Sequence, residues 1–544
     1  MRIDNFQCSK AVSVFPGKVI LKANTAAFMV IQNTYWSDNA RDIEPACFIQ
    51  PKTTQDVSKI VAHLTTPDNI ECRFAIKSGG HTFWAGAANL QGGITMDLSK
   101  LNQIDIAADK KIAKIGPGNR WGAVFEAVEK EGMAVAGGRM SSVGVGGLLT
   151  GGGLSFFQPF GGFSCDGILN HEVVLANGSI VNANRNENPD LHRALKGGGN
   201  NFGIVTRFDL HMFPKPKLWG GIFLAMDQRK KALDWLVEGS ISNNDTNTMV
   251  AVSMLTPTTT LSLAVDPDVN RQPVLMEKAN EMAVITNRSM AGWFGTAVVN
   301  STAVGRPSRI GISGIPTSIY TTMKAFFSSL KDGPNTLTTA ATNSSSLPGM
   351  QLQPGKFYAL TSPAGIAGIL GSAAETGFRL HFFSWNIKVS KTATAPYLEA
   401  LTDLHKSEGA KLPLFSNPSI FFQPITSRMR HAGEAIGGPN AMGLKELLGD
   451  DDLILVAVGV RYWFKSDGDK VVKWAKEFTK MGKNMAEEKG VGSPWQYVNY
   501  SDGWQDAMGT YGKEAREFLK GISRRYDPRG TFQKQVPGGF KLGM

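Results

Sequence analysis

Glycine is the residue that most constrains how this chain can fold. The 544 residues include 60 glycines, which gather between Gly79 and Gly203 without the period of a repeat protein. Because glycine has no side chain, a bound pyrophosphate can approach main-chain N–H donors closely. The clusters therefore predict a dinucleotide site, although each cluster alone is more typical of an ordinary loop. They are Ser78-Gly79-Gly80-His81-Thr82, Gly116-Pro117-Gly118, Val143-Gly144-Val145-Gly146-Gly147 through Gly151-Gly152-Gly153, and Lys196-Gly197-Gly198-Gly199-Asn200.

A Rossmann fingerprint does not explain these glycines. Gly116 and Gly118 have the first spacing of that motif, but Gly122 falls one residue late. No strand, turn and helix followed by a suitably placed acid can be read after them. The partial match to the Rossmann fingerprint is therefore coincidental.

Length and composition favour a multidomain globular chain. A prior of roughly 150 residues per domain predicts two or more domains. The hydrophobic fraction is 42%, and no apolar run approaches the roughly 20 residues that span a bilayer. The net charge of +11 comes from scattered Lys and Arg without interleaved aromatics. We therefore expect no membrane and no nucleic-acid partner.

Periodicity predicts alternating short strands and helices in the first 215 residues. Cys47–Pro51, Arg73–Lys77, Lys114–Gly116 and His171–Leu175 read as strands, and the last ends at an Asn177-Gly178 hairpin signal. Further predicted elements are a helix capped by Thr53 or Thr54 with Val57, Ile60, Val61 and Leu64 on one face, a strand over Gly93–Leu98, a helix over Trp121–Glu131 and a strand over Gly203–Phe208.

The predicted organisation has four segments. Residues 1–41 read as an irregular lead-in, 42–215 as the cofactor domain, 216–475 as a substrate domain, and 476–544 as a C-terminal segment that packs back on the cofactor domain. The fold class is α+β.

Taken together, the motifs resemble those of the vanillyl-alcohol-oxidase (PCMH) type of FAD-binding domain. Within that superfamily the chain is similar to fungal berberine-bridge-enzyme-like oxidoreductases. The resemblance covers about residues 34–215 and 494–542, and it implies two FAD-binding subdomains plus a central antiparallel sheet covered by helices. The motifs that carry it are Thr34-Tyr35-Trp36-Ser37, Lys77-Ser78-Gly79-Gly80-His81, Asp97-Leu98-Ser99, the clusters above, Asp166, Tyr497-Val498-Asn499-Tyr500-Ser501-Asp502 and Tyr526-Asp527-Pro528-Arg529-Gly530.

The resemblance implies FAD bonded covalently to His81. A neutral imidazole is a nucleophile near neutral pH, and attachment makes the flavin a stronger oxidant. By resemblance, the predicted cofactor-binding residues are Lys77, Ser78, Gly79, Gly80, His81, Thr82, Ser142, Val143, Gly144, Gly147, Gly151, Gly152, Ser155, Asp166, Gly203, Ile204, Val205, Tyr497 and Asn499.

Two positions next to the third glycine cluster bear on the type of flavoenzyme. Many relatives add a second tether through cysteine where this chain has Met140, and a thioether cannot form that bond. Single attachment through His81 is therefore expected. Val143 matches the position that gates oxygen in the family, where valine favours an oxidase.

The substrate side is harder to predict. The strand that carries a catalytic carboxylate in relatives corresponds to Leu453–Phe464, which contains no acid; Arg461 is its main polar candidate with Tyr462. We predict Tyr497 as the base, through a pKa lowered beside an arginine. His381 and Trp385 are further cleft candidates on Phe378–Trp385, whose alternation suits a sheet floor or a plain buried strand.

Two classes of function follow. The first is an oxidase that moves a hydride from an alcohol or C–H centre of a secondary metabolite or sugar to flavin N5, with O2 reduced to H2O2. The alternative is a redox-neutral isomerase or cyclase, which the missing carboxylate favours. We expect a small-molecule substrate and a monomer.

Cysteines and sequons bear on the compartment. Cys8, Cys47, Cys72 and Cys165 lack CxxC spacing, so no metal site is expected, and two disulfides or four thiols both stay open. Sequons at Asn177, Asn244, Asn287, Asn300, Asn343 and Asn499 favour a secreted glycoprotein. The start MRIDNFQCSK has no apolar leader, which leaves a cytoplasmic location or a leader removed before numbering.

Overall fold

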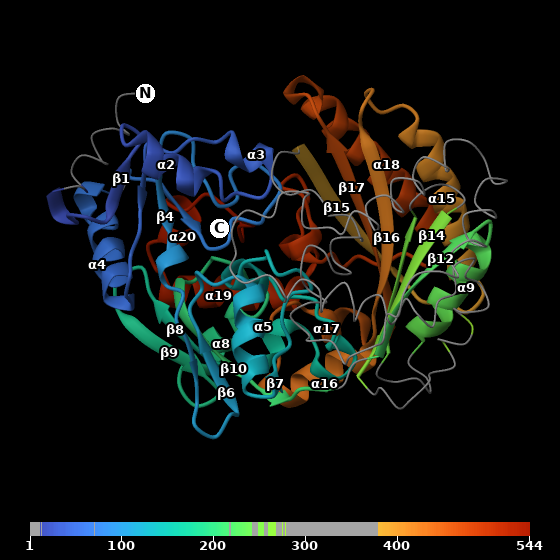
Figure 1. Ribbon diagram of the computed structural model, residues 1–544, viewed down its shortest axis with the longest axis horizontal. Coiled ribbons are helices and arrows are strands. Elements are labelled where there is room, and N and C mark those ends of the chain that lie inside the picture. The colour runs from blue at the N-terminus through green and yellow to red at the C-terminus, as the bar shows by residue number, and fades with distance from the viewer. Residues whose placement is uncertain are drawn as a thin grey trace, which may run out of the picture.

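The molecule has two lobes, an N-terminal lobe in blue and cyan and a central lobe in green and orange (Figure 1). The computed structural model describes residues 11, 13–69, 71–216, 219–241, 248–254, 259–267, 275, 278 and 379–543. Each lobe combines sheets with helices, as the predicted α+β class requires.

The first sheet of the N-terminal lobe is mixed and has the order β1-β2-β4-β3. Its strands are β1 (Val19–Leu21), β2 (Cys47–Ile49), β3 (Phe74–Lys77) and β4 (Ile94–Asp97), with helices α2 (Thr25–Gln32), α3 (Asp38–Arg41) and α4 (Thr54–Leu64). The Thr53 side chain accepts a hydrogen bond from Asp56 N and begins α4, which buries Val57, Ile60, Val61 and Leu64 as predicted. β1 pairs with β2, so the predicted irregular lead-in is wrong: an antiparallel strand supplies the hydrogen bonds that the edge of β2 needs.

The second sheet is antiparallel, with the order β5-β6-β10-β8-β9. The Asn177-Gly178 turn joins β8 to β9 as the hairpin signal predicted. The elements of this part are β5 (Ile104–Ile106), β6 (Ile112–Ile115), α5 (Trp121–Lys130), β7 (Met133–Ala134), α6 (Val145–Thr150), α7 (Gln158–Gly161), β8 (Ile168–Val174), β9 (Ile180–Asn184), α8 (Pro189–Leu195), β10 (Ile204–His211) and β11 (Phe213–Pro214).

The central lobe is built on an antiparallel sheet of order β12-β14-β13-β16-β17-β15. One face, with Phe383, Trp385, Val456 and Val458, packs on helices α9, α15 and α18. The other face turns toward the N-terminal lobe. The elements are β12 (Trp219–Met226), α9 (Arg229–Ser240), β13 (Met249–Met254), β14 (Thr259–Asp266), β15 (Arg379–Lys388), α15 (Thr394–Gly409), β16 (Asn417–Ile425), α16 (Ser427–Gly437), α17 (Leu444–Leu448), β17 (Leu453–Tyr462) and α18 (Gly468–Glu488).

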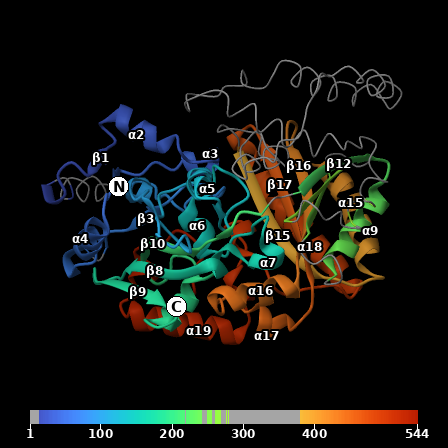
Figure 2. The same cartoon turned by 60° about the horizontal axis from the view of Figure 1, so that its bottom comes forward.

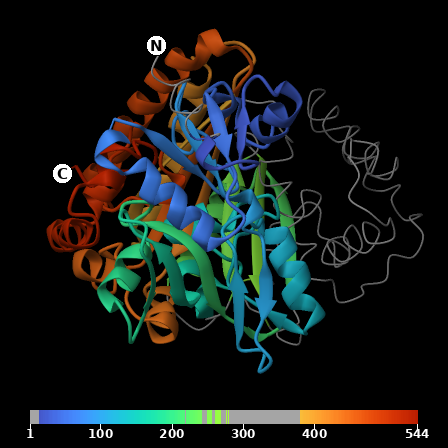
Figure 3. The same cartoon turned by 90° about the vertical axis from the view of Figure 1, so that its left-hand side faces the viewer.

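The C-terminal segment lies against the N-terminal lobe. Helices α19 (Lys513–Tyr526) and α20 (Thr531–Lys534) are drawn in red within that lobe in Figure 1 and along its flank in Figure 3. Gln535 Nε2 donates to Leu64, Asn69 and Cys72 carbonyls. The predicted boundary at residue 475 falls inside α18, whose continuous amphipathic face packs on β15.

Helix α16 holds the two lobes together at their base, where it lies beside α7 (Figure 2). Asp166, which is fully buried, accepts hydrogen bonds from Phe163 N and from Asn440 Nδ2. A Cβ at Gly433 of α16 would lie 2.1 Å from its carboxylate, so only glycine allows this approach. Asp166 thus anchors the loop that precedes β8.

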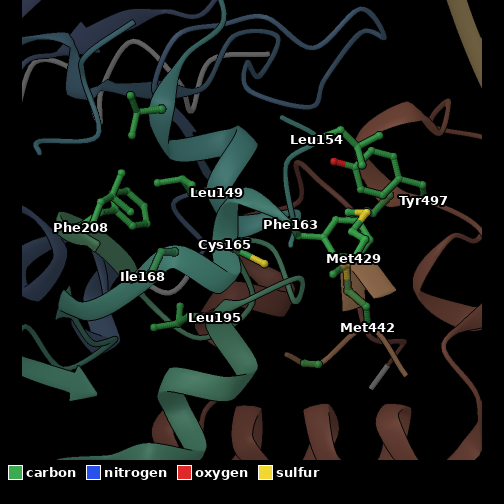
Figure 4. Close-up of a cluster of buried hydrophobic side chains, with 14 of the residues drawn as sticks. Leu149, Leu154, Phe163, Cys165, Ile168, Leu195, Phe208, Met429, Met442 and Tyr497 are labelled. Atoms are coloured by element: carbon green, nitrogen blue, oxygen red, sulfur yellow. The ribbon is translucent and has the colours of Figure 1, made fainter. Parts of the chain in front are cut away.

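The cysteines match neither of the two open alternatives. Cys47 is disulfide-bonded, whereas Cys165 carries a buried thiol. Figure 4 shows Cys165 in the hydrophobic cluster with Phe163 and Tyr497.

Among the described residues, none of the helices combines the length and apolar character that crossing a bilayer would require.

Candidate active site

A cavity of about 430 Å³ lies between the glycine clusters and the face of the central sheet that turns toward the N-terminal lobe. The N-terminal lobe lines it with Trp36, the loop 78–84, residues 139–140, 143–144, 146–148 and 150–151, and Gly203–Val205. The sheet contributes side chains from four strands, and the C-terminal segment contributes residues 497–501. The described sheet residues are Ala251, Val252, Ser253, Leu380, Phe382, Ser419, Phe421, Gly459 and Arg461.

The glycine clusters cross at very short range in the cavity wall. A Cβ at Gly79 would lie 2.4 Å from Gly144 Cα, and one at Gly144 would lie 2.5 Å from Gly79 Cα. A Cβ at Gly147, by contrast, would have nothing within 4 Å. At Gly79 and Gly144 any side chain would therefore collide with the backbone of the other segment. At Gly147 the space beside the backbone is open to a ligand in the cavity. This open backbone fits the dinucleotide that the glycine clusters predict.

His81 lines the cavity, and Ser142 and Trp36 hold its imidazole ring. Its Nε2 is 3.2 Å from Ser142 Oγ, and its ring stacks on Trp36 with centroids 4.6 Å apart and planes 13° apart. Burial and the positive charge of Arg120 lower the pKa of His81 to about 3. The imidazole is therefore neutral near pH 7, as a nucleophile must be.

The predicted cofactor residues divide into a lining and a support. The cavity is lined by Ser78, Gly79, Gly80, His81, Thr82, Val143, Gly144, Gly147, Gly151, Gly203, Ile204, Val205, Tyr497 and Asn499. Lys77, Ser142, Gly152, Ser155 and Asp166 stand behind this lining. Lys77 pairs with Asp97 at 3.0 Å beneath the Ser78–Thr82 loop, and both side chains are almost fully buried. Ser155 accepts a hydrogen bond from Phe157 N.

Tyr497 is not the ionisable base that the sequence predicted. Its hydroxyl accepts hydrogen bonds from Gly153 N and Asn499 Nδ2, at 2.8 and 3.2 Å. Burial raises the pKa of Tyr497 well above its ordinary value. The predicted lowering of this pKa is therefore wrong, because the residue is a hydrogen-bonded core tyrosine (Figure 4).

The sequon that begins at Asn499 has its asparagine side chain packed within the protein. Its Nδ2 donates to Leu148 O at 3.0 Å, and its Oδ1 would lie 2.0 Å from a Cβ at Gly151. This packing leaves no room for a glycan on the folded chain.

His381 and Trp385 point to the other face of the central sheet. Strand alternation was predicted correctly, but Leu380 and Phe382 face the cavity. Trp385 packs among the helices, and His381 is held by Asp502, with Nδ1 and Oδ2 2.7 Å apart. Of the two interpretations, the plain buried strand is confirmed for Trp385, and the cavity-facing one is wrong by one residue, because period-two alternation does not tell which face the helices cover. Arg461 does line the cavity.

A tyrosine and arginine pair that the sequence interpretation missed occupies the same wall. Arg139 Nη2 donates to Tyr500 Oη at 2.6 Å, and both residues line the cavity. The Tyr500 ring packs edge-on against Phe382 and Phe421 of the sheet. The signal was present in the Tyr497–Asp502 motif, but the sequence does not reveal which tyrosine meets an arginine.

Comparison with known proteins agrees with this geometry. Residues 45–184 match the family model described as an FAD binding domain. Berberine-bridge-enzyme-like 1 of Physcomitrella patens has a TM-score of 0.66 and 16% identity, over 99% of both chains. Glucooligosaccharide oxidase of Acremonium strictum has a TM-score of 0.62 and 17% identity, over 93% of this chain and 95% of that one. These two neighbours show the fold that the chain shares, and the family model identifies residues 45–184 as an FAD binding domain.

A fungal relative shows the family. The chain is 32% identical over 519 residues to the FAD-dependent monooxygenase tpcD of Cochliobolus heterostrophus, which covers 94% of this chain and 88% of that protein. The chain therefore belongs to the family of fungal FAD-dependent oxidoreductases that includes this protein.

Proposed function

We propose that the protein is an oxidase that removes a hydride from an alcohol or C–H centre of an aromatic secondary metabolite. FAD bound by these residues would supply the hydride acceptor, at N5, with O2 as the final electron acceptor reduced to H2O2. The observation that carries the proposal is the Arg139–Tyr500 pair, which lies in the same cavity as the glycine loops and His81.

The cofactor would be held by the backbone of the glycine loops and tethered by His81. The open space at Gly147 and the neutral imidazole of His81 support this assignment. The structural neighbour from Acremonium strictum is described as carrying a 6-S-cysteinyl, 8α-N1-histidyl FAD. In this chain Met140 lines the cavity near His81, so we propose a single bond through histidine.

Tyr500 is our candidate for the base in place of Tyr497. Its hydroxyl accepts a hydrogen bond from Arg139 Nη2 at 2.6 Å, which fixes the phenolic oxygen at the cavity wall. From the cavity wall, that oxygen can take the proton of a substrate hydroxyl while hydride leaves the neighbouring carbon. Arg461, on the sheet, would hold the developing alkoxide.

An aromatic substrate suits the lining better than a sugar does. The sheet and the C-terminal segment present Phe382, Phe421, Leu380 and Tyr500 to the cavity. Among the described lining residues there is no Asp or Glu. A sugar needs acceptors for several hydroxyl groups, whereas flat apolar walls bury an aromatic ring.

The redox-neutral alternative keeps one supporting observation. β17, which corresponds to the strand with the carboxylate base in relatives, contributes Gly459 and Arg461 to the lining and no acid. An isomerase or cyclase would use the same cavity without net electron transfer.

A single anaerobic experiment distinguishes these chemistries. Phenolic and benzylic alcohols are added without oxygen while the flavin absorbance near 450 nm is recorded. We expect bleaching, and one H2O2 per turnover after air is admitted. Turnover without bleaching would favour the redox-neutral reaction. Transfer of an oxygen atom from 18O2 into the product would identify a monooxygenase instead, the activity in the name of the fungal relative.

Val143 lines the cavity, and by the family resemblance its position controls the access of oxygen to the flavin. If it controls oxygen access, Val143→Leu slows reoxidation of the reduced flavin and leaves substrate bleaching unchanged. Equal reoxidation rates in variant and wild type would remove Val143 from this role.

A further inference from the structure

Three segments far apart in the sequence meet around the imidazole of His81. Trp36 stacks on one side of the ring, and Ser142 Oγ lies 3.2 Å from Nε2. Trp36 N also donates to Gly80 O at 3.0 Å, which fixes the indole segment to the loop that carries His81. The ring is therefore constrained in both its plane and its rotation.

Arg120 joins the two segments that hold the ring. One of its guanidinium nitrogens, Nη1, donates to Ser142 O, and Nη2 donates to Thr34 O at 3.3 Å. Trp121 N donates to Val143 O and Gly122 N donates to Ser141 O, so the chain on either side of Ser142 is fixed as well. This network is preorganised, and Trp36, Arg120 and Ser142, which surround His81 in it, lie outside the glycine clusters.

We propose that Trp36 and Ser142 are positioning residues for the covalent attachment of FAD to His81. This inference rests on the covalent attachment in the proposed function. With Nε2–H donated to Ser142 Oγ, the lone pair remains on Nδ1, and stacking on Trp36 aims that nitrogen.

The bond-forming step balances with O2 as oxidant. A bond forms between Nδ1 and the 8α carbon of the flavin, which loses one hydrogen. The imidazole loses its Nε2 proton on the side of Ser142 Oγ, and this proton is released to solvent. The two electrons pass through the flavin to O2, which takes up two protons and becomes H2O2.

The rate of attachment tests the proposal independently of turnover. Full-length apoprotein is made under riboflavin limitation and mixed with FAD in air, and covalent flavin is followed by fluorescence in denaturing gels. Noncovalent binding is measured in parallel by quenching of free FAD. Ser142→Ala and Trp36→Leu should slow attachment at least about 10-fold, because small misplacements of reacting atoms cost up to about 100-fold. Binding of FAD should change little.

Conservative variants and a neighbour give the controls. Ser142→Thr and Trp36→Phe keep the hydroxyl and the stacking ring, so they should recover most of the rate. Ser141→Ala changes the adjacent serine, whose carbonyl oxygen accepts a hydrogen bond from Gly122 N, and should attach FAD at the wild-type rate.

The outcomes separate this inference from the proposed function. If wild type binds FAD but never attaches it, the covalent part of the proposed function fails. If wild type attaches FAD and both Ser142→Ala and Trp36→Leu do so at the same rate, the positioning role is wrong. A loss of attachment that Ser142→Thr and Trp36→Phe do not recover would equally contradict it.

Discussion

The two walls of the cavity are built by different means. On the side of the N-terminal lobe, backbone segments cross so closely that Gly79 and Gly144 exclude any side chain. On the side of the central lobe, alternate strand residues such as Phe382 and Arg461 face the cavity. The first wall depends on backbone conformation and the second on side-chain chemistry. Backbone requirements restrict the sequence to glycine, whereas the substrate wall can be lined by many residue types.

This difference predicts that the substrate wall can lose activity without losing the cofactor. Tyr500→Phe removes the phenolic oxygen and keeps the ring packing on Phe382. We expect turnover to fall about 10²- to 10⁴-fold, as for removal of a general base, with flavin content unchanged. Turnover and flavin absorbance measured on the same preparation check this.

Phe382→Leu serves as a control on the same wall. It removes an aromatic contact but no ionisable group, so it should raise KM more than it lowers kcat. Full activity of Tyr500→Phe would exclude the phenol as the base.

Substitutions in the wall formed by the N-terminal lobe should instead lower the stability of the fold, most strongly at the buried ion pair beneath that wall. Asp97→Asn leaves the Lys77 ammonium buried without its carboxylate. Breaking such a pair costs about 3–5 kcal/mol of unfolding free energy. Urea denaturation should show this loss together with a lower flavin content.

The exposed pair Lys130 and Glu126 offers a matched comparison. Glu126→Gln should change the unfolding free energy by no more than about 0.5 kcal/mol. Similar small losses at both sites would show that burial of the Lys77 pair contributes nothing special.

Two glycines of the same wall should respond differently to one methyl group. Gly79→Ala forces apart two backbones and should cost about 1–3 kcal/mol, or prevent folding. Gly147→Ala meets no protein atom, so the protein should fold normally and bind FAD more weakly. Thermal unfolding and FAD titration of the apoprotein separate the two effects. Normal FAD affinity in Gly147→Ala would remove this part of the backbone from the cofactor site.

The N-terminal lobe should also lose stability in acid through two buried histidines. The Nδ1 atoms of His171 and His192 are 3.0 Å apart. Burial lowers the pKa of His171 well below its usual value and that of His192 to about 4. The unfolded chain, with histidine pKa values of about 6.5, binds more protons as the pH falls.

The unfolding free energy should therefore decrease from about pH 6.5 down toward pH 4. At pH 5, His192 alone should account for about 1–2 kcal/mol of this decrease. Urea midpoints at pH 7 and pH 5 measure it, and His192→Gln should reduce the difference between them. His431→Gln, at an exposed position, should leave the difference unchanged. A midpoint independent of pH in wild type would contradict the buried, neutral state of the pair.

The same contrast explains what the sequence could predict. The glycine motifs located the cofactor side, and the face of α4 was predicted residue by residue. No role at the site was predicted for Trp36, Arg120 or Arg139, because their contacts depend on segments brought together by the fold. Tyr497 and His381 are residue types that can act as a base, but the fold places neither where it was predicted to act. Tyr497 is buried with its hydroxyl hydrogen-bonded, and His381 pairs with Asp502 on the helix-covered face of the sheet.

The central claim is that the backbone around the Ser78–Thr82 loop holds FAD and that His81 is bonded to it. Its most direct test is mass analysis of the peptide containing His81, after acid precipitation of the purified protein. The account predicts a yellow pellet and a peptide whose mass is increased by one FAD less two hydrogens. A colourless pellet with all flavin in the supernatant, and an unmodified His81 peptide, would contradict it.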